Sequence, residues 1–287
     1  MKLLIIFFTI FFLYFILKRK NNYSVDKREK YFEYYSYKSQ IRDWNSYLKV
    51  FYPIILIFLS VGLNNILVSL FIFLITNYIT IYLGKIPIKR YIDSWKIPFL
   101  FLIFTIIVIN INISKYKIGD YNFYFLNNYI YFTKEKLYES TEIFFRVISG
   151  ISSMYMLIYS TSIEEIIKVL RKIKIPNIII EIMYLTYRYI FILLNTYYEM
   201  RVAMESRLGF INYNLSLNSF GKIISNIFFI SFRKSMAFYE AMEARNYNGK
   251  LIFFEKKEKF QKKIFFNMLL SIVFLILVFI FEKNRWN

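Results

Sequence analysis

Long runs without a charged residue alternate along this chain with short segments rich in lysine and arginine. The charge-free runs cover residues 50–63, 66–83, 97–114, 147–162 and 264–281. A helix needs ~20 mostly apolar residues to cross the ~30 Å hydrocarbon core of a bilayer, and these runs approach that length. Asn64 and Asn65 separate the first two runs and predict a tight turn. The pattern predicts an all-α integral membrane protein with about five to six transmembrane helices.

A further apolar segment, residues 3–17, precedes the basic triplet Lys18-Arg19-Lys20. It has the length of a signal peptide, but no small-residue cleavage site follows it and the charges lie on the wrong side. We interpret it as an uncleaved anchor with its N-terminus outside. A helix lying in the membrane interface is the alternative, and the sequence leaves both open.

The distribution of positive charge predicts the orientation of the chain. Lys and Arg number 38, against 19 Asp and Glu. Basic side chains are dense in residues 18–49, 84–96, 163–176 and 250–263, whereas residues 115–141 contain four in 27 positions. Because cytoplasmic loops carry the excess of Lys and Arg, we expect the first four segments to be cytoplasmic and 115–141 to be external. The basic clusters adjoin apolar runs, so we expect contact with a bacterial cytoplasmic membrane and not with nucleic acid.

Residues 163–250 follow a different pattern. Residues 163–175 have the pattern of a basic amphipathic helix, which Pro176 ends. The next stretch, 177–208, begins apolar but carries Glu181, Arg188, Glu199 and Arg201 ahead of its last few residues. A charge at the bilayer centre costs roughly 2.5–3.5 kcal/mol, so we expect a long helix running obliquely from the membrane into the cytoplasm. After an Asn-rich break at 212–218, residues 219–245 predict a second long amphipathic helix.

The composition excludes several kinds of chemistry. The chain has no His and no Cys, which removes disulfides, thiolate nucleophiles, His-based catalysis and nearly all zinc sites. Gly221-Lys222 is similar to part of a phosphate-binding loop, but Ser216 and Ile223 stand where that loop needs Gly and Ser or Thr. Close helix packing is the expected role of Gly221. We therefore predict no catalytic residue, no cofactor and no metal site. The charge-free runs also argue against an autonomous ion-coupled transporter.

Two similar strings end the two long amphipathic helices. Residues 203–209 read Ala-Met-Glu-Ser-Arg-Leu-Gly, and residues 241–249 read Ala-Met-Glu-Ala-Arg-Asn-Tyr-Asn-Gly. A single Glu-small-Arg string is ordinary helix composition, and the helix dipole partly explains an Arg at a C-terminus. Neither explanation accounts for the repeated Ala-Met-Glu, so we take Arg207 and Arg245 as candidate functional residues.

At these residues the chain resembles the T component of energy-coupling factor transporters, in particular the CbiQ-like members of cobalt and nickel systems. The resemblance covers roughly residues 84–250. Besides the two strings, it rests on Ser162-Ile163-Glu164-Glu165-Ile166, Val169-Leu170-Arg171-Lys172, Ile175-Pro176 and Tyr187-Arg188-Tyr189. The chain departs from the family pattern at Leu208 and Asn246, which replace the usual Gly, and at Ser206, which replaces Ala in the first string.

The resemblance implies a scaffold that is not an enzyme. It would transmit the motion of two ATPase subunits to a substrate-binding membrane subunit, with cobalt or nickel as the transported ion. The residues implied in docking to the ATPases are Arg207, Arg245, Glu205, Glu243, Ser206 and Ala244, with Pro176, Arg188, Gly209 and Gly249 as supports. On this interpretation, the chain divides into an N-terminal anchor and basic segment (1–49), a transmembrane bundle (50–162), coupling helices (163–250), and a basic linker with the last span (251–287).

Three alternatives stay open at this stage. Related T components serve vitamin importers, so the substrate follows only from the likeness to one subgroup. A membrane-embedded enzyme would need an acid–base or metal constellation, which the sequence does not contain. A stand-alone permease is disfavoured because the apolar runs carry no charge. Co-purification with ATPase subunits would distinguish the scaffold from the enzyme and the permease.

Overall fold

The computed structural model describes residues 32–114, 121–125, 128–249, 251, 258 and 260–286. The expected anchor at 3–17 lies outside these residues. The elements, in chain order, are α2 (Phe32–Lys38), the 3-10 helix η2 (Gln40–Asp43), α3 (Ser46–Leu63), α4 (Ile66–Asn77), the π-helical η3 (Tyr78–Leu83), α5 (Ile88–Asn110), β1 (Asn112–Ser114), β2 (Tyr121–Phe125), β3 (Asn128–Phe132), α6 (Lys134–Ser160), α7 (Ile163–Lys172), α8 (Asn177–Ser206), α9 (Tyr213–Glu243) and α10 (Lys262–Trp286).

The helical membrane fold expected from the sequence is confirmed. By length and composition, seven of the described helices could cross a membrane, namely α3, α4 with η3, α5, α6, α8, α9 and α10. The turn expected between the first two runs is present. Asn64 has a left-handed backbone with φ of 46°, and the Asn65 side chain accepts a hydrogen bond from the Val68 N–H at 3.1 Å, which caps α4.

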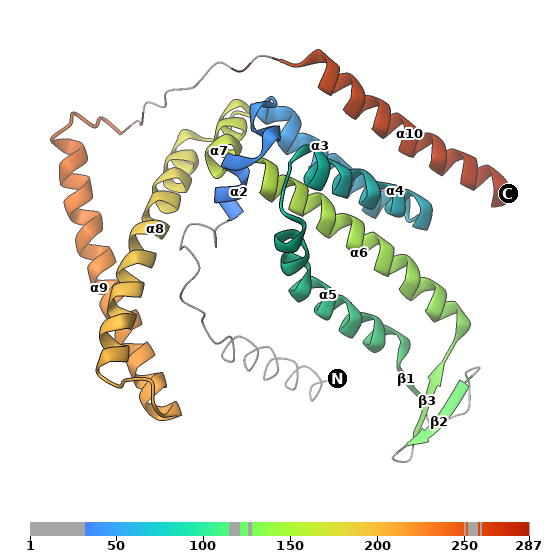
Figure 1. Ribbon diagram of the computed structural model, residues 1–287, viewed down its shortest axis with the longest axis horizontal. Helices are drawn as coiled ribbons and strands as arrows, with labels where there is room; N and C mark the ends of the chain where they lie inside the picture. Colours follow the sequence, from blue (N-terminus) through green and yellow to red (C-terminus); the bar gives the residue numbers. More distant parts are fainter. Residues whose placement is uncertain are drawn as a thin grey trace.

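Helix α6 packs against α3, α4 and α5, and α10 lies against α3 and α4 (Figure 1). The core between these helices contains Leu56, Ile72, Met156 and Leu275, all at most 1% exposed. Small hydroxyl side chains line the same contacts, and Thr76 meets Ser152 at 2.7 Å between their oxygens. Such hydrogen bonds join helices in an apolar environment, where the hydrophobic effect does little.

Some of the expected boundaries were wrong. Helix α5 begins at Ile88 and α6 at Lys134, well before the charge-free runs at 97 and 147. The break expected at 212–218 is much shorter, since α9 begins at Tyr213. Charged and amide side chains continue a helix at a cost of a few tenths of a kcal/mol when they face outward, so a loss of hydrophobicity does not by itself end one. Residues 112–132 add a small antiparallel sheet, ordered β1-β3-β2, which the sequence did not predict.

The sheet and α7 lie at opposite ends of the bundle in Figure 1. The start of α3 lies beside α7, and the sheet follows the far end of α5. From α7 the chain continues into α8 and α9, which form a hairpin at a steep angle to α6. Of the segments expected to be cytoplasmic, residues 32–49, 84–96 and 163–176 thus lie toward the end of the bundle from which the hairpin extends.

Candidate functional site

The two arginine strings end their helices with the same backbone geometry. In the first, the Gly209 N–H donates to the Met204 carbonyl at 2.9 Å and the Leu208 N–H to the Glu205 carbonyl at 3.0 Å. In the second, the Tyr247 N–H donates to the Met242 carbonyl at 3.0 Å and the Asn246 N–H to the Glu243 carbonyl at 2.9 Å. These paired bonds are those of the Schellman motif. Arg207 and Arg245 therefore hold equivalent positions at two matching helix ends, which we call the first and second tip.

Leu208 and Asn246 occupy the left-handed position of each motif, with φ of 57° and 62°. This is the position for which glycine is preferred, because it has no Cβ to clash with the neighbouring carbonyl. The departures from the family pattern noted in the sequence therefore keep the helix-end geometry. Asn adopts this conformation readily, whereas Leu does so at a cost.

Replacing Leu208 by Gly should consequently stabilise the protein. The Leu208 side chain is 65% exposed, so little packing would be lost. Relief of the left-handed strain, offset by the greater freedom of Gly in the unfolded chain, should leave a gain of about 0.5–1 kcal/mol. The melting temperature in detergent measures it. Asn246→Gly is the matched control and should gain less. A loss of stability in Leu208→Gly would mean that the leucine side chain makes contacts the structure does not contain.

Both tips are accessible. Arg207, Ser206 and Glu205 are exposed at the first tip, and Arg245, Ala244 and Glu243 at the second. Glu205 forms an ion pair with Arg201 at 3.0 Å, one turn earlier on α8. Gly249, two residues beyond the Schellman motif of the second tip, has φ of 83°, so any other residue there would be strained.

Helices α8 and α9 are antiparallel neighbours, so the tips lie at opposite ends of the hairpin (Figure 1). Arg188 of α8 places its guanidinium 5.1 Å from the Phe238 ring centre of α9, and Tyr189 meets the same ring edge-on at 5.3 Å. The Lys234 ammonium donates to the Thr196 hydroxyl at 3.1 Å. Arg188 thus lies between the two helices. Pro176 directly precedes α8, at a position where a backbone N–H would have no partner within the helix, so its missing N–H costs nothing. A Cβ on Gly221 would meet nothing within 4 Å, so the close packing expected there is wrong for this chain.

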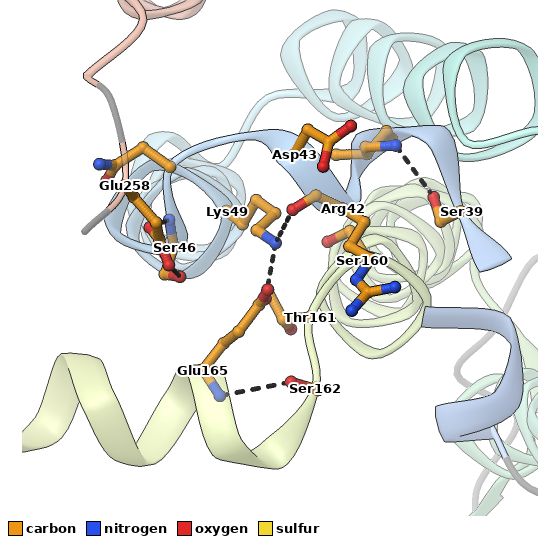
Figure 2. A network of polar contacts seen from close by, with 12 residues as sticks. Ser39, Arg42, Asp43, Ser46, Lys49, Ser160, Thr161, Ser162, Glu165 and Glu258 are labelled. Carbon is orange, nitrogen blue, oxygen red and sulfur yellow. Dashed lines mark hydrogen bonds and ion pairs between the residues drawn. The ribbon is translucent and has the colours of Figure 1, made fainter. Parts of the chain in front are cut away.

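Helix α7 is held against α3 by a buried ion pair (Figure 2). The Lys49 ammonium lies 2.6 Å from a Glu165 carboxylate oxygen and donates to the Arg42 carbonyl at 3.0 Å, and the Lys49 side chain is fully buried. Burial raises the pKa of Glu165 above its ordinary value, despite the nearby lysine. Ser162 caps α7 by accepting from the Glu165 N–H at 3.4 Å. The Glu165 backbone thus takes part in the cap of α7, while its side chain ties α7 to the bundle through Lys49.

A second carboxylate, Glu258, joins three parts of the chain at this place. It accepts from the Ser46 N–H at 2.7 Å and the Ser46 hydroxyl at 2.6 Å, at the N-terminus of α3, where the helix dipole favours an anion. The Lys168 ammonium of α7 lies 2.6 Å from it. Glu258 thus connects the segment before α10 to α3 and α7. Lys49 and Glu258 were not among the residues singled out in the sequence, because each acts through partners distant in the chain.

The Glu258 contacts should depend on pH in a defined window. Burial acts to raise the pKa of this carboxyl, but hydrogen bonds from Lys168 and Ser46 outweigh it, and the pKa lies below the ordinary 4.5. A pKa that is lower in the folded chain adds stability that is complete above the unfolded value and lost as the pH falls through the folded value. The difference in melting temperature between wild type and Glu258→Gln should therefore stay constant near neutral pH and shrink only below about pH 4.5. A difference that shrinks already between pH 7 and 5 would contradict this, and Glu240→Gln, at an exposed position of α9, is the control.

The described residues contain no group of three or more Asp, Glu, His or Cys that could hold a metal ion. Their polar contacts instead connect helices: Lys49, Glu165, Lys168 and Glu258 at the bundle, and Arg188 and Lys234 in the hairpin. This arrangement can transmit a force between an exposed tip and the bundle, because buried or half-buried contacts fix α8 to α9 and α7 to α3.

Comparison with known proteins gives a family and several relatives. The family described as CbiQ, cobalt transport protein, matches residues 37–257. An uncharacterized protein of Methanocaldococcus jannaschii is 28% identical over 87% of this chain and 92% of its own length. A protein of Methanocorpusculum labreanum, described as a fused cobalt transport protein CbiMQ, is 25% identical over 74% of this chain and 35% of its own length. The cobalt transport protein CbiQ of Salmonella typhimurium is 27% identical over 48% of this chain and 61% of its own.

Proposed function

The chain belongs to the CbiQ family of cobalt transport proteins, and we propose that it is the coupling scaffold of an ATP-driven importer. In this role it has no catalytic activity of its own. It transmits the motion of two ATPase subunits to a separate membrane subunit that binds the substrate. The observation that carries the proposal is the pair of matching arginine tips, which end two long helices joined to the membrane bundle through α7.

The geometry of the hairpin supports one orientation of these helices. Helix α8 has 30 residues and α9 has 31, so at 1.5 Å per residue each is about 45 Å long. If α8 and α9 crossed the bilayer, the two tips would lie on opposite sides of it, and only one could meet a cytoplasmic ATPase. Both can do so if the hairpin lies along the cytoplasmic membrane surface, a course we propose in place of the oblique one expected from the sequence. A separation of about 45 Å also suits two docking sites on two subunits better than two sites on one.

The exposed apolar side chains of the hairpin support a further contact. Helix α9 exposes Phe220, Ile224, Phe228, Phe229, Phe232 and Met236. A contiguous apolar surface of this kind marks a protein or membrane contact. In the proposed orientation it would face the bilayer and the substrate-binding subunit. Cobalt is the proposed substrate, after the names of the relatives, with nickel as the nearest alternative, and a vitamin would require a different partner subunit.

Reconstitution with the partner subunits tests the function. The chain, its two ATPase subunits and its substrate-binding subunit, purified together and placed in vesicles, should accumulate Co²⁺ only when ATP is supplied. Omitting this chain should abolish uptake while leaving ATP hydrolysis by the ATPases. Uptake that continues without the chain, or ATP hydrolysis by the chain alone, would overturn the proposal.

A further inference from the structure

Two buried polar residues of the hairpin lie beside the tips. Glu181, in the second turn of α8, is 5% exposed, and Ser219 of α9 is 7% exposed. Each makes its hydrogen bonds to the end of the other helix. We propose that Glu181 and Ser219 are positioning residues, each of which fixes the tip of the neighbouring helix. The inference rests on the proposed coupling function and adds to it the side chains that set the tip geometry.

Ser219 fixes the first tip. Its hydroxyl donates to the Gly209 carbonyl at 2.8 Å, two residues beyond Arg207. A Cβ on Gly209 would lie 2.6 Å from that hydroxyl oxygen and 3.0 Å from the Met204 carbonyl oxygen. The left-handed position of this tip is taken by Leu208, so Gly209 is not needed there for its backbone angle. It is needed because α9 approaches the tip this closely.

Glu181 fixes the second tip. Its two carboxylate oxygens accept from the Tyr247 hydroxyl at 3.1 Å and from the Leu251 N–H at 3.0 Å. These bonds hold the chain after Arg245 at two places, Tyr247 and Leu251. Burying a carboxylate is costly unless it is hydrogen-bonded, and a purely packing role at this position would be served by an apolar residue. The buried charge is accounted for if its task is to hold the backbone that follows the second tip.

The contacts made by Glu181 and Ser219 are reciprocal. Helix α8 carries the first tip and holds the second, whereas α9 carries the second and holds the first. A shift of one helix along the other therefore disturbs both tips at once. The two ATPase contacts become interdependent without any direct contact between them.

Spin labels at single cysteines test the positioning role on the chain alone, without ATPases. Ile211 and Asn248 are exposed and follow the two tips, and the chain has no native Cys. Glu181→Ala should increase the mobility of the label at 248 and leave 211 unchanged, and Ser219→Ala should do the reverse. Glu181→Gln should preserve most of the order, because its amide oxygen can accept from Leu251 and its amide nitrogen can donate to the Tyr247 hydroxyl. Equal mobility changes at both labels, or none, would overturn the inference.

The same variants in the full complex test whether positioning matters for docking. Glu181→Ala and Ser219→Ala should each weaken ATPase retention roughly tenfold, as expected when a buried hydrogen bond is lost. The loss of retention caused by Glu181→Ala should add little to the loss caused by Arg245→Ala but should add fully to that caused by Arg207→Ala. The reason is that the effects of residues acting at one site are not additive. The docking role would be overturned if label mobility changes at the expected tips while the loss of retention caused by Glu181→Ala adds fully to that of both arginine variants. If Arg207→Ala and Arg245→Ala themselves leave retention unchanged, the proposed function fails while the label result still stands.

Discussion

Alanine at Arg207 or Arg245 should weaken retention of the ATPase subunits by about thirtyfold to several thousandfold. Removing one partner of a buried, hydrogen-bonded charge pair costs about 2–5 kcal/mol, much of it from leaving the other charge unpaired, at tenfold per 1.4 kcal/mol. The double variant should not assemble. Arg→Lys should recover only part of the loss, because the ammonium keeps the charge but loses the planar fork that binds a carboxylate bidentately. Pull-down of the ATPases and Co²⁺ uptake in vesicles measure both effects.

Arg233 provides the matched control. It lies on α9 between the two tips and is exposed, so its replacement by alanine should change retention by no more than the ~0–1 kcal/mol of a surface charge. Small and similar losses for Arg207, Arg245 and Arg233 would mean that all three merely solvate helix surfaces. The tips would then have no part in docking.

The second large effect is expected at the ion pair that holds α7 to α3. Lys49→Met leaves Glu165 without its partner, and Glu165→Gln leaves a fully buried ammonium with only the Arg42 carbonyl and an amide. Breaking a buried pair by removing one partner typically costs about 3–5 kcal/mol. Each single change should therefore lower the melting temperature markedly. It should also reduce Co²⁺ uptake more than ATP hydrolysis, because α7 lies between the hairpin and the bundle.

Two further variants decide whether the ion pair itself is responsible. Lys49→Met combined with Glu165→Met removes both charges and should recover much of the stability, as replacing a buried pair by apolar residues often does. Lys96→Met breaks an exposed pair with Asp93, whose side chains are 69% and 41% exposed, and should cost little. A double variant as unstable as the sum of the single ones would show that the two residues act separately.

Local signals in the sequence were sufficient to predict much of this fold. The charge-free runs mark α3, α4, the second half of α5, the end of α6 and most of α10, since a bilayer imposes its own length on a span. Asn64-Asn65 marks a turn because Asn tolerates the left-handed conformation and also caps a helix. The two strings could be recognised because a helix end depends on a few consecutive residues.

The contacts that fix the hairpin and α7 could not be predicted in this way. Glu258 lies 212 residues from Ser46, and Glu181 lies 66 from Tyr247, so no local pattern relates them. One signal was available: Lys49 lies in the first turn of α3, where the helix dipole disfavours a cation, which indicates an anionic partner. Strands β2 and β3 were missed because nothing in a polar, Tyr-rich loop distinguishes them from irregular structure, and β1 was missed because it ends the charge-free run 97–114, which predicts a continuous span.

Labelling of single cysteines in intact cells tests the central claim most directly. That claim is that both tips lie on the cytoplasmic side, with the hairpin along the membrane and not across it. A membrane-impermeant maleimide should label a cysteine at Asn128, at the start of β3, without permeabilisation. It should label cysteines at Ile211 and Asn248, beyond the first and second tips, only after the membrane is opened. Labelling of one of the two tip positions from outside, with the other protected, would contradict the account, because α8 and α9 would then span the bilayer.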